Sequence, residues 1–231
     1  MQWITLIQHL AKHYPDVSLI AVSKYHDTQA MRRVLSCGVL FFGEARVNDA
    51  SWKFEELADP TFEKHLIGHL QSRNVRQAVE IFDVIQTVDS LKLATKIDRI
   101  AGETWKTQRI LIQVNLTGEK GKYGFRVPSS KYQIPNGDKE FGTWHSKFGI
   151  TQVIDEIRQL QNLQLEWLMC MGQKGDAEIT RKAFRELRTL VDQYELIHCS
   201  MGMSEDWQIA IEEGSTMVRI GRAIFDDQWN N

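Results

Sequence analysis

The sequence predicts an α/β fold: a single (β/α)8 barrel of the TIM type with an extra N-terminal helix. Short apolar runs rich in β-branched residues alternate eight times with stretches whose apolar residues recur at helical spacing. The chain has 231 residues, which is enough for eight such units in one domain spanning residues 1–231. An open doubly wound sheet is the alternative, but no G-x-G-x-x-G motif follows a predicted strand.

The chain begins with an amphipathic pattern. Apolar positions 3, 4, 6, 7 and 10 are interrupted by polar ones, and no basic segment precedes them. This pattern predicts a helix rather than a signal peptide. No window of the sequence is long and apolar enough to span a bilayer.

The eight predicted strands are short and apolar, and turn-forming residues bound them. The fifth, residues 110–115, is among the most strand-like segments of the chain. In chain order the strands cover residues 19–24, 40–44, 65–68, 84–88, 110–115, 163–170, 196–200 and 217–221.

Capping residues mark where the intervening helices begin. Asp27 is a predicted N-cap, Ser72 begins a later helix, and Asp89 or Ser90 caps the next one. Ser204 is predicted to cap the helix before the last strand. Apolar residues recur at helical spacing over residues 30–35, 47–57, 75–82, 91–100, 153–160, 183–191 and 207–211.

The alternation of strands and helices lapses over about residues 126–149. This polar stretch contains prolines and glycines, and a segment of such length in a compact domain is a surface excursion or a lid. Trp144 and Phe148 within it indicate that it packs against another part of the protein.

The amino-acid composition argues against several functional classes. The 28 basic and 30 acidic residues give a formal charge of −2, so no general field draws the chain to nucleic acid or to an anionic membrane. Three cysteines are an odd number without C-x-x-C spacing, which indicates neither a disulfide framework nor a zinc site. We therefore expect a cytoplasmic monomer with no nucleic-acid or membrane partner.

Polar residues and glycines follow the predicted strands. In a parallel barrel the C-terminal strand ends form one rim, which is where functional residues gather. The residues at this rim are Lys24, Glu44, residues 68–72, Asp89, Ser90, Asn115, residues 200–204 and residues 219–222. This set is compatible with one ligand.

Lys24 ends the first predicted strand. A lysine at the mouth of an apolar barrel is desolvated, which lowers its pKa and yields a neutral amine able to attack an aldehyde. One alternative is an exposed lysine with no such role. Another is a base in a barrel enzyme that acts on a phosphate-bearing ligand.

Two glycine-bearing turns favour a phosphate. The first precedes a predicted helix, where free N–H groups and the helix dipole favour an anion. The second offers a close backbone approach, because glycine has no Cβ. The two turns are Ser200-Met201-Gly202-Met203-Ser204 and Gly221-Arg222.

Arg219 is expected to point into the barrel mouth and donate a hydrogen bond to a ring nitrogen or a phosphate. Its guanidinium cannot be deprotonated, so a pyridine facing it stays unprotonated and is a weaker electron sink. A salt bridge to Glu44 or Asp206 is the alternative. For His69 a structural hydrogen bond is expected, and His65 is expected to be a core or edge histidine.

Several segments, in this order, resemble the pyridoxal phosphate homeostasis protein family, whose members are similar to the N-terminal barrel of alanine racemase. The resemblance extends from residue 19 to residue 225 and is interrupted by the polar stretch. The segments are Ala21-Val22-Ser23-Lys24, Phe42-Gly43-Glu44, residues 65–72, residues 88–94, residues 113–115, residues 200–204 and residues 217–221.

The resemblance implies a fold-type III barrel that holds pyridoxal 5′-phosphate as an internal aldimine on Lys24. It implies phosphate contacts from residues 200–204, Gly221 and Arg222, with Arg219 near the pyridine ring. The implied role is intracellular pyridoxal phosphate (vitamin B6) homeostasis without strong catalysis, because a racemase takes its second base from a separate domain. An apo-enzyme or a regulatory protein is the implied partner.

A pyridoxal phosphate-dependent amino-acid racemase or lyase is the alternative function. The polar stretch would then act as a lid, and Tyr123 or His145 would supply an acid or base at the free face of the cofactor.

The chain departs from the family pattern at two positions near the expected cofactor. Ala45 stands where the family has Asn, and Arg222 stands where it has Thr or Ser. We expect a hydrogen bond to the ring substituents to be missing, and the Arg222 guanidinium could replace a hydroxyl contact to phosphate.

Overall fold

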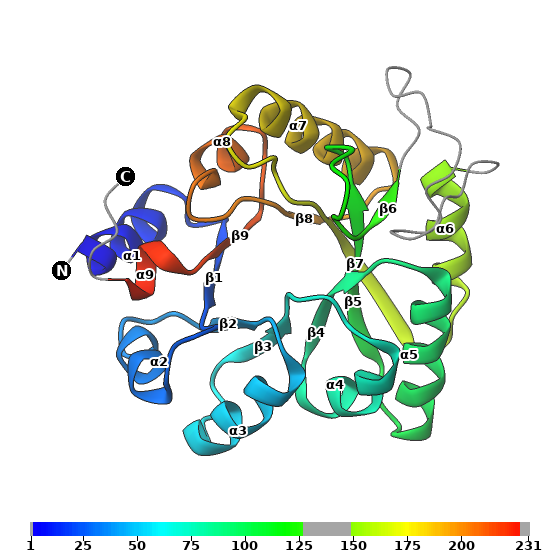
Figure 1. The fold of residues 1–231 in the computed structure, drawn as a ribbon, viewed down its shortest axis with the longest axis horizontal. Coiled ribbons are helices and arrows are strands. Elements are labelled where there is room, and N and C mark those ends of the chain that lie inside the picture. Colours follow the sequence, from blue (N-terminus) through cyan, green and yellow to red (C-terminus); the bar gives the residue numbers. More distant parts are fainter. Residues whose placement is uncertain (1, 127–148, 227–231) are drawn as a thin grey trace.

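The computed structural model describes residues 2–126 and 149–226, within which eight parallel strands form a closed ring (Figure 1). These strands are β1 (Ser18–Val22), β2 (Phe41–Glu44), β3 (Glu63–Leu66), β4 (Val84–Val88), β5 (Gln108–Asn115), β7 (Leu163–Met169), β8 (His198–Ser200) and β9 (Met217–Ile220). They pair in the order β4-β3-β2-β1-β9-β8-β7-β5, and pairing of β5 with β4 closes the ring. The predicted (β/α)8 barrel is confirmed.

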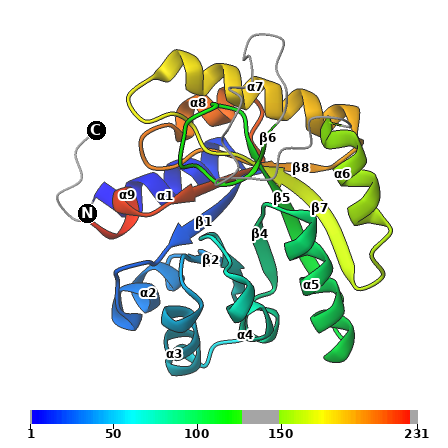
Figure 2. The ribbon, with the colours of Figure 1, turned by 45° about the vertical axis from the view of Figure 1, so that its right-hand side comes forward.

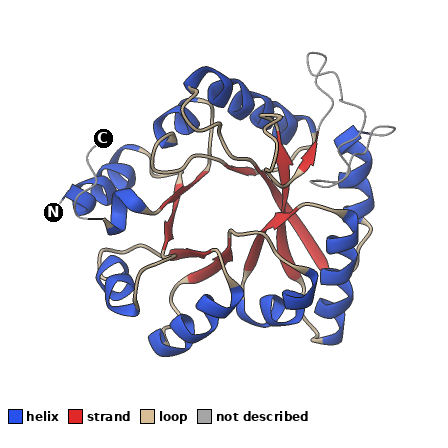
Figure 3. Cartoon of the chain, viewed as in Figure 1, coloured by secondary structure: helices blue, strands red, loops and turns tan. Residues whose placement is uncertain are grey.

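Helices surround the ring of strands, as Figure 3 shows. They are α1 (Gln2–His13), α2 (Thr28–Leu35), α3 (Val47–Leu57), α4 (Val75–Ile81), α5 (Leu91–Glu103), α6 (Gly149–Arg158), α7 (Ala177–Gln193), α8 (Trp207–Glu212) and α9 (Arg222–Phe225). The predicted N-terminal helix is α1, and it lies beside α9 at the edge of the ring (Figures 1 and 2). In the described ranges, no helix combines the length and the apolar character needed to cross a membrane.

Two of the predicted helix caps form, and one prediction is wrong. The carboxylate of Asp27 and the hydroxyl of Ser90 each accept a hydrogen bond from the backbone N–H three residues later. Ser204 does not cap α8, because that helix begins only at Trp207 and Asp206 occupies the N-cap position. The Ser204 hydroxyl is buried and faces the start of α9 instead.

The structure adds two local details. The short strand β6 (Phe125–Arg126) pairs with β5 outside the ring and was not predicted. Ser72 begins a 3-10 turn, Ser72–Asn74, that leads into α4. The predicted polar excursion at residues 126–149 lies outside the described residues, except that Arg126 ends β6 and Gly149 begins α6.

The barrel buries side chains on both faces of its strands. Outward-facing apolar residues pack against the helices in one large cluster. A second cluster fills the interior and consists of Ile20, Val84, Leu111, Trp167, Met169 and Met217. Buried polar residues share the interior with it: His65, Gln86, Ser200 and Arg219. Because an unpaired buried polar group is costly, each of these side chains needs a partner.

Charged side chains close the base of the barrel near the N-terminal ends of β3 and β5. Arg109 lies 2.5 Å from a carboxylate oxygen of Glu63 and 2.7 Å from one of Glu166. His65 Nε2 lies 2.8 Å from Glu63 Oε1. Burial alone would raise the pKa of Glu63, but its contacts with His65 and Arg109 outweigh burial and lower the pKa to about 2.

The loop after β3 packs directly on the loop after β2. A Cβ placed on Gly68 would lie 2.0 Å from the carbonyl oxygen of Ala45. Only glycine allows the two backbones to approach so closely. Gly68 therefore fixes the spacing of two neighbouring loops at the C-terminal rim.

We expect Gly68→Ala to lower the free energy of unfolding by about 2 kcal/mol, because a backbone segment must move to admit the methyl group. The matched control is Gly102→Ala in α5, where the new Cβ meets the Asn162 side chain at 2.9 Å. That side chain can rotate, and alanine favours the helix by up to about 1 kcal/mol. Urea unfolding midpoints test the pair. Equal midpoints for the two variants would contradict the close approach.

We expect Glu63 to make the protein less stable in acid. A carboxyl group whose pKa is lowered by folding contributes stability above its unfolded value of about 4.3, and this contribution is lost as the pH falls through the folded value. Between pH 5 and pH 2 the loss from Glu63 should be roughly 2 kcal/mol, after allowance for solvent screening of a partly exposed carboxylate. Glu63→Gln should be less stable at pH 6 and should show a flatter dependence on pH in urea unfolding. An unchanged slope would count against this assignment.

Candidate functional site

The predicted amine and both glycine-bearing turns lie at neighbouring strand ends. β1 pairs with β9 in parallel, with Ile20 opposite Arg219, and β9 pairs with β8. A Cβ on Gly221 would lie 3.3 Å from Val22, which is two residues before Lys24. Because all these strands run in the same direction, residue 24 and the turns that follow β8 and β9 share one rim of the barrel.

Lys24 itself is exposed, so the expected desolvation of its amine by the protein is wrong. After β1, Tyr25 adopts the left-handed region of backbone conformation, with φ of 73°. Lys24 Nζ lies 5.7 Å from the centroid of the Tyr25 ring, which is 80% exposed. His26 then stacks on Phe225 of α9, with ring centroids 4.6 Å apart. The loop that carries Lys24 is therefore attached to α9 on one side and leaves the amine accessible.

A buried ion pair holds the peptide that precedes Lys24. Lys53 of α3 donates to Glu44 Oε1 at 2.7 Å and to the carbonyl oxygen of Ser23 at 3.0 Å. The Ser23 hydroxyl donates to the same Glu44 oxygen at 2.8 Å. All three side chains are buried, so water does not compete for these contacts. The end of β1 is thereby tied to the end of β2 and to α3.

The sequence interpretation missed Lys53, because a lysine on a helix is usually exposed. The position of Lys53 relative to the apolar residues of the helix could nevertheless have indicated that it is buried. Lys53 lies on the apolar face of α3 that Ala50, Phe54 and Leu57 form. A lysine within such a stripe needs a buried partner, and Glu44 was the available carboxylate.

The turns after β8 and β9 contact each other. The backbone N–H of Arg219 donates to the carbonyl oxygen of Gly202 at 2.9 Å, and that of Ala223 donates to the Ser204 hydroxyl at 3.5 Å. Gly202 has φ of 95°, and a Cβ there would lie 2.5 Å from the Cβ of Ala210. A larger residue at 202 would therefore disrupt the joint surface of the two turns.

The remaining residues of the first turn differ in exposure. Met201 is buried in the core, whereas Met203 is 38% exposed at the rim. The Met203 backbone N–H donates to Asp206 Oδ1 at 2.5 Å. Burial raises the pKa of Asp206, and this hydrogen bond opposes the increase. The Asp206 side chain therefore binds the backbone of the turn at Met203 and does not cap α8.

The Arg222 guanidinium is directed along the surface. It donates to Glu205 Oε1 at 2.5 Å, and both side chains are exposed. Glu205, which directly follows the first turn, binds the Arg222 cation in this arrangement. The expected contact of the Arg222 guanidinium with a phosphate would therefore compete with this ion pair. The second departure, Ala45, lies at the same rim and contacts Gly68 through its backbone.

Arg219 is almost fully buried inside the barrel. Its Nη1 donates to Ser200 Oγ at 2.5 Å and its Nη2 to the carbonyl oxygen of Cys170 at 2.9 Å. No carboxylate in the described ranges lies within ion-pair distance of it, and Glu44 is paired with Lys53. The predicted alternative of a salt bridge to Glu44 or Asp206 is therefore not formed. Burial lowers the pKa of Arg219, because the cation is removed from water.

His69 has the structural hydrogen bond that was expected, and the structure identifies the partner. Its Nδ1 lies 3.0 Å from Asp89 Oδ2, across the loops after β3 and β4. The ring stacks on Tyr123, with centroids 3.7 Å apart. Burial raises the pKa of Asp89, and the contact with His69 opposes that increase. His145, the second predicted acid or base, lies outside the described residues.

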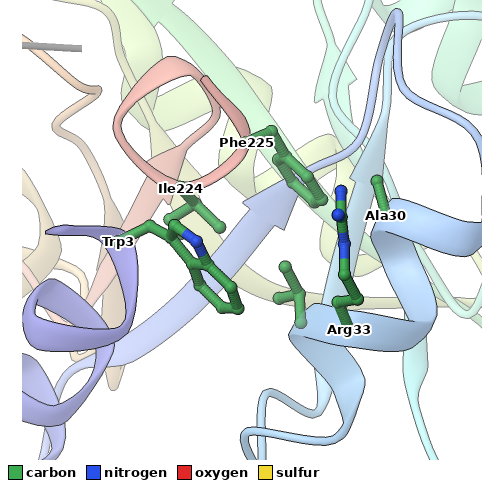
Figure 4. A pocket seen from close by; sticks show the side chains of 6 residues that line it. Trp3, Ala30, Arg33, Ile224 and Phe225 are labelled. Atoms are coloured by element: carbon green, nitrogen blue, oxygen red, sulfur yellow. The ribbon is translucent and has the colours of Figure 1, made fainter. Parts of the chain in front are cut away.

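A small cavity lies apart from these residues, between α1, α2 and α9 (Figure 4). It is lined by Trp3, Ala30, Arg33, Val34, Ile224 and Phe225. None of the predicted site residues lines it, so it gives no support to a ligand at the rim.

Proteins of similar sequence share one name. The pyridoxal phosphate homeostasis protein of Synechocystis sp. is 32% identical over 222 residues, which cover 93% of each chain. The protein of the same name from Escherichia coli K12 is 30% identical over 221 residues, covering 91% of this chain and 85% of the relative. No protein-family model matches the chain.

Solved structures of similar fold include PipY of Synechococcus elongatus, described with pyridoxal phosphate bound. It shares 35% identity with this chain and has a TM-score of 0.80 over 97% of this chain and all of PipY. The same protein without the cofactor has a TM-score of 0.82. An alanine racemase of Clostridium difficile, 14% identical, matches with a TM-score of 0.71 over 58% of its length, which is a likeness of fold alone.

We expect Lys53→Met to lower the free energy of unfolding by about 3 kcal/mol, because it leaves the buried Glu44 carboxylate without a cation. Adding Glu44→Gln to Lys53→Met should recover most of this loss, since no unpaired charge then remains. Urea unfolding of the two single variants and the double variant gives the coupling between them. Additive losses in the double variant would show that the two side chains do not interact.

Proposed function

Because the chain belongs to the pyridoxal phosphate homeostasis protein family, we propose that it binds pyridoxal 5′-phosphate and contributes to the homeostasis of this cofactor as one barrel domain spanning residues 1–231. The family membership rests on relatives at 30% identity or more over about nine-tenths of the chain. The observation that supports the assignment of the site is that β1, β9 and β8 are neighbouring parallel strands, so that Lys24 and the turns at residues 200–204 and 221–222 follow strand ends on one rim.

The residues at this rim fit the three chemical groups of the cofactor. Pyridoxal phosphate carries an aldehyde, a phosphate and a pyridine nitrogen. An exposed primary amine, that of Lys24, suits the aldehyde. Glycine-bearing turns with backbone N–H groups, at residues 200–204 and 221–222, suit a phosphate. The buried guanidinium of Arg219, which has no carboxylate partner among the described residues, suits an electron-rich ring atom.

The bound cofactor would supply an aldehyde that condenses with amines and a ring that withdraws electrons. In our proposal Lys24 holds the aldehyde end, and residues 200–204 with Gly221 and Arg222 hold the phosphate end. Arg219 donates a hydrogen bond toward the ring nitrogen and keeps it unprotonated, because a guanidinium does not give up its proton. An unprotonated ring withdraws electrons weakly, which suits storage of the cofactor more than catalysis.

We propose that the protein acts in the cytoplasm as a monomer and exchanges the cofactor with an apo-enzyme or a regulatory protein. The near-neutral formal charge of −2 gives no general attraction to nucleic acid or membranes. The exposed position of Lys24, beside the exposed Tyr25, supports access by a protein partner to the loop that holds the cofactor.

We expect the purified protein mixed with pyridoxal phosphate to show a violet absorbance band that borohydride abolishes, leaving a label on Lys24. Lys24→Ala should lose this band and bind the cofactor more weakly by a factor of about 10 to 100, because the phosphate contacts remain as a separate contribution. Lys92→Ala removes an exposed lysine of α5 and serves as the control, with an unchanged band. An unaltered absorbance spectrum in Lys24→Ala would show that Lys24 is not the residue that binds the aldehyde.

A further inference from the structure

A continuous series of buried polar side chains crosses the interior of the barrel below the candidate site. It begins at Arg219, whose Nη1 donates to Ser200 Oγ at 2.5 Å. The Ser200 hydroxyl donates to Gln86 Oε1 at 2.9 Å. Ser200 is on β8 and Gln86 on β4, and these two strands do not pair, so the contact spans the interior.

The series continues from Gln86 to the base of the barrel. Gln86 Nε2 lies 2.9 Å from His65 Nδ1 and 3.2 Å from Met217 Sδ. The second nitrogen of His65, Nε2, lies 2.8 Å from Glu63 Oε1. Glu63 in turn pairs with Arg109. We call the side chains of Arg219, Ser200, Gln86, His65 and Glu63 the interior relay.

The donors of the interior relay all point the same way. The Gln86 amide oxygen accepts from Ser200, so its NH2 group faces His65 and donates to Nδ1. The imidazole proton then belongs on Nε2, which lies 2.8 Å from Glu63 Oε1 without a well-aligned hydrogen bond between the two atoms. Burial lowers the pKa of His65, which agrees with a neutral ring. A cation stands at one end and a carboxylate at the other, and the three hydrogen bonds from Arg219 to His65 run in one direction.

Because the side chains of the interior relay are buried, the orientation of each one depends on the side chain that it contacts. The side chains of His65, Gln86 and Ser200 have no exposed surface, and Arg219 is 4% exposed. Water cannot substitute for a missing member, so the loss of one contact leaves the neighbouring group unpaired or free to rotate. Among the described residues, Arg219 also donates to the Cys170 carbonyl oxygen, but only through its second nitrogen, Nη2.

We propose that Gln86 and His65 are positioning residues that hold Arg219 through Ser200, so that the base of the barrel sets the orientation of the guanidinium at its mouth. This inference rests on the proposed function, in which Arg219 faces the pyridine ring. Neither Gln86 nor His65 touches the cofactor in this proposal. Their effect on cofactor binding passes entirely through the interior relay.

The test compares Gln86→Met with Gln113→Met in the full-length protein. Gln113 is also buried, but its amide donates to the carbonyl oxygen of Tyr123 at 3.0 Å and takes no part in the interior relay. Gln86→Met should raise the dissociation constant for pyridoxal phosphate about tenfold and shift the visible band. Gln113→Met should change the dissociation constant less than twofold and leave the band in place.

A second measurement separates positioning from a general loss of structure. Arg219→Lys keeps the positive charge but removes the guanidinium with its Nη1 and Nη2 donors. In this background, Gln86→Met should have no further effect on the dissociation constant. If Gln86→Met raised the dissociation constant by the same factor in the Arg219→Lys background as in the wild-type protein, the proposal would be overturned. If Gln86→Met does not fold, as judged by thermal unfolding, His65→Phe takes its place, with an expected rise of about threefold in the dissociation constant.

The outcomes distinguish the two levels of inference. Equal behaviour of Gln86→Met and Gln113→Met, with cofactor bound by the wild-type protein, overturns the positioning role alone. Failure of the wild-type protein to bind pyridoxal phosphate overturns the proposed function, and the positioning role with it.

Discussion

The parallel pairing of β1 with β9 is the constraint on which the candidate site depends. These are the first and last strands of the ring, and their hydrogen-bond ladder sets Ile20 opposite Arg219. Val22, two residues before Lys24, and Gly221 become neighbours only because the ring closes in this register. Since side chains alternate between the two faces of a strand, a slip of one residue would turn Arg219 out of the barrel and remove it from the mouth.

The barrel interior combines two kinds of packing. An apolar cluster that includes Ile20 and Trp167 fills part of it, and the interior relay fills the rest. Polar groups in such a place add little net stability compared with well-packed apolar ones, but a fully paired series admits few alternative arrangements. In this proposal the orientation of Arg219 depends on Gln86 and His65 inside the barrel as well as on its direct contacts with Ser200 and Cys170.

The sequence was most informative where the determining interactions are local. Strand and helix periodicity predicted the eight strands of the ring, and Asp27 caps its helix as expected, because both depend on residues close in the chain. Ser204 failed as a cap because its hydroxyl contacts Ala223, nineteen positions later, which no local pattern reveals. Gln86 was not recognised for the same reason, since its partners lie on other strands.

The ion pair behind Lys24 also bears on chemical selectivity. Two primary amines flank the Ser23 peptide, one from Lys24 and one from Lys53. The Lys53 side chain is buried between a carboxylate and a carbonyl oxygen, so its amine is not accessible to an electrophile. Of the two amines on either side of Ser23, only that of Lys24 is therefore accessible to an aldehyde that arrives at this end of the barrel.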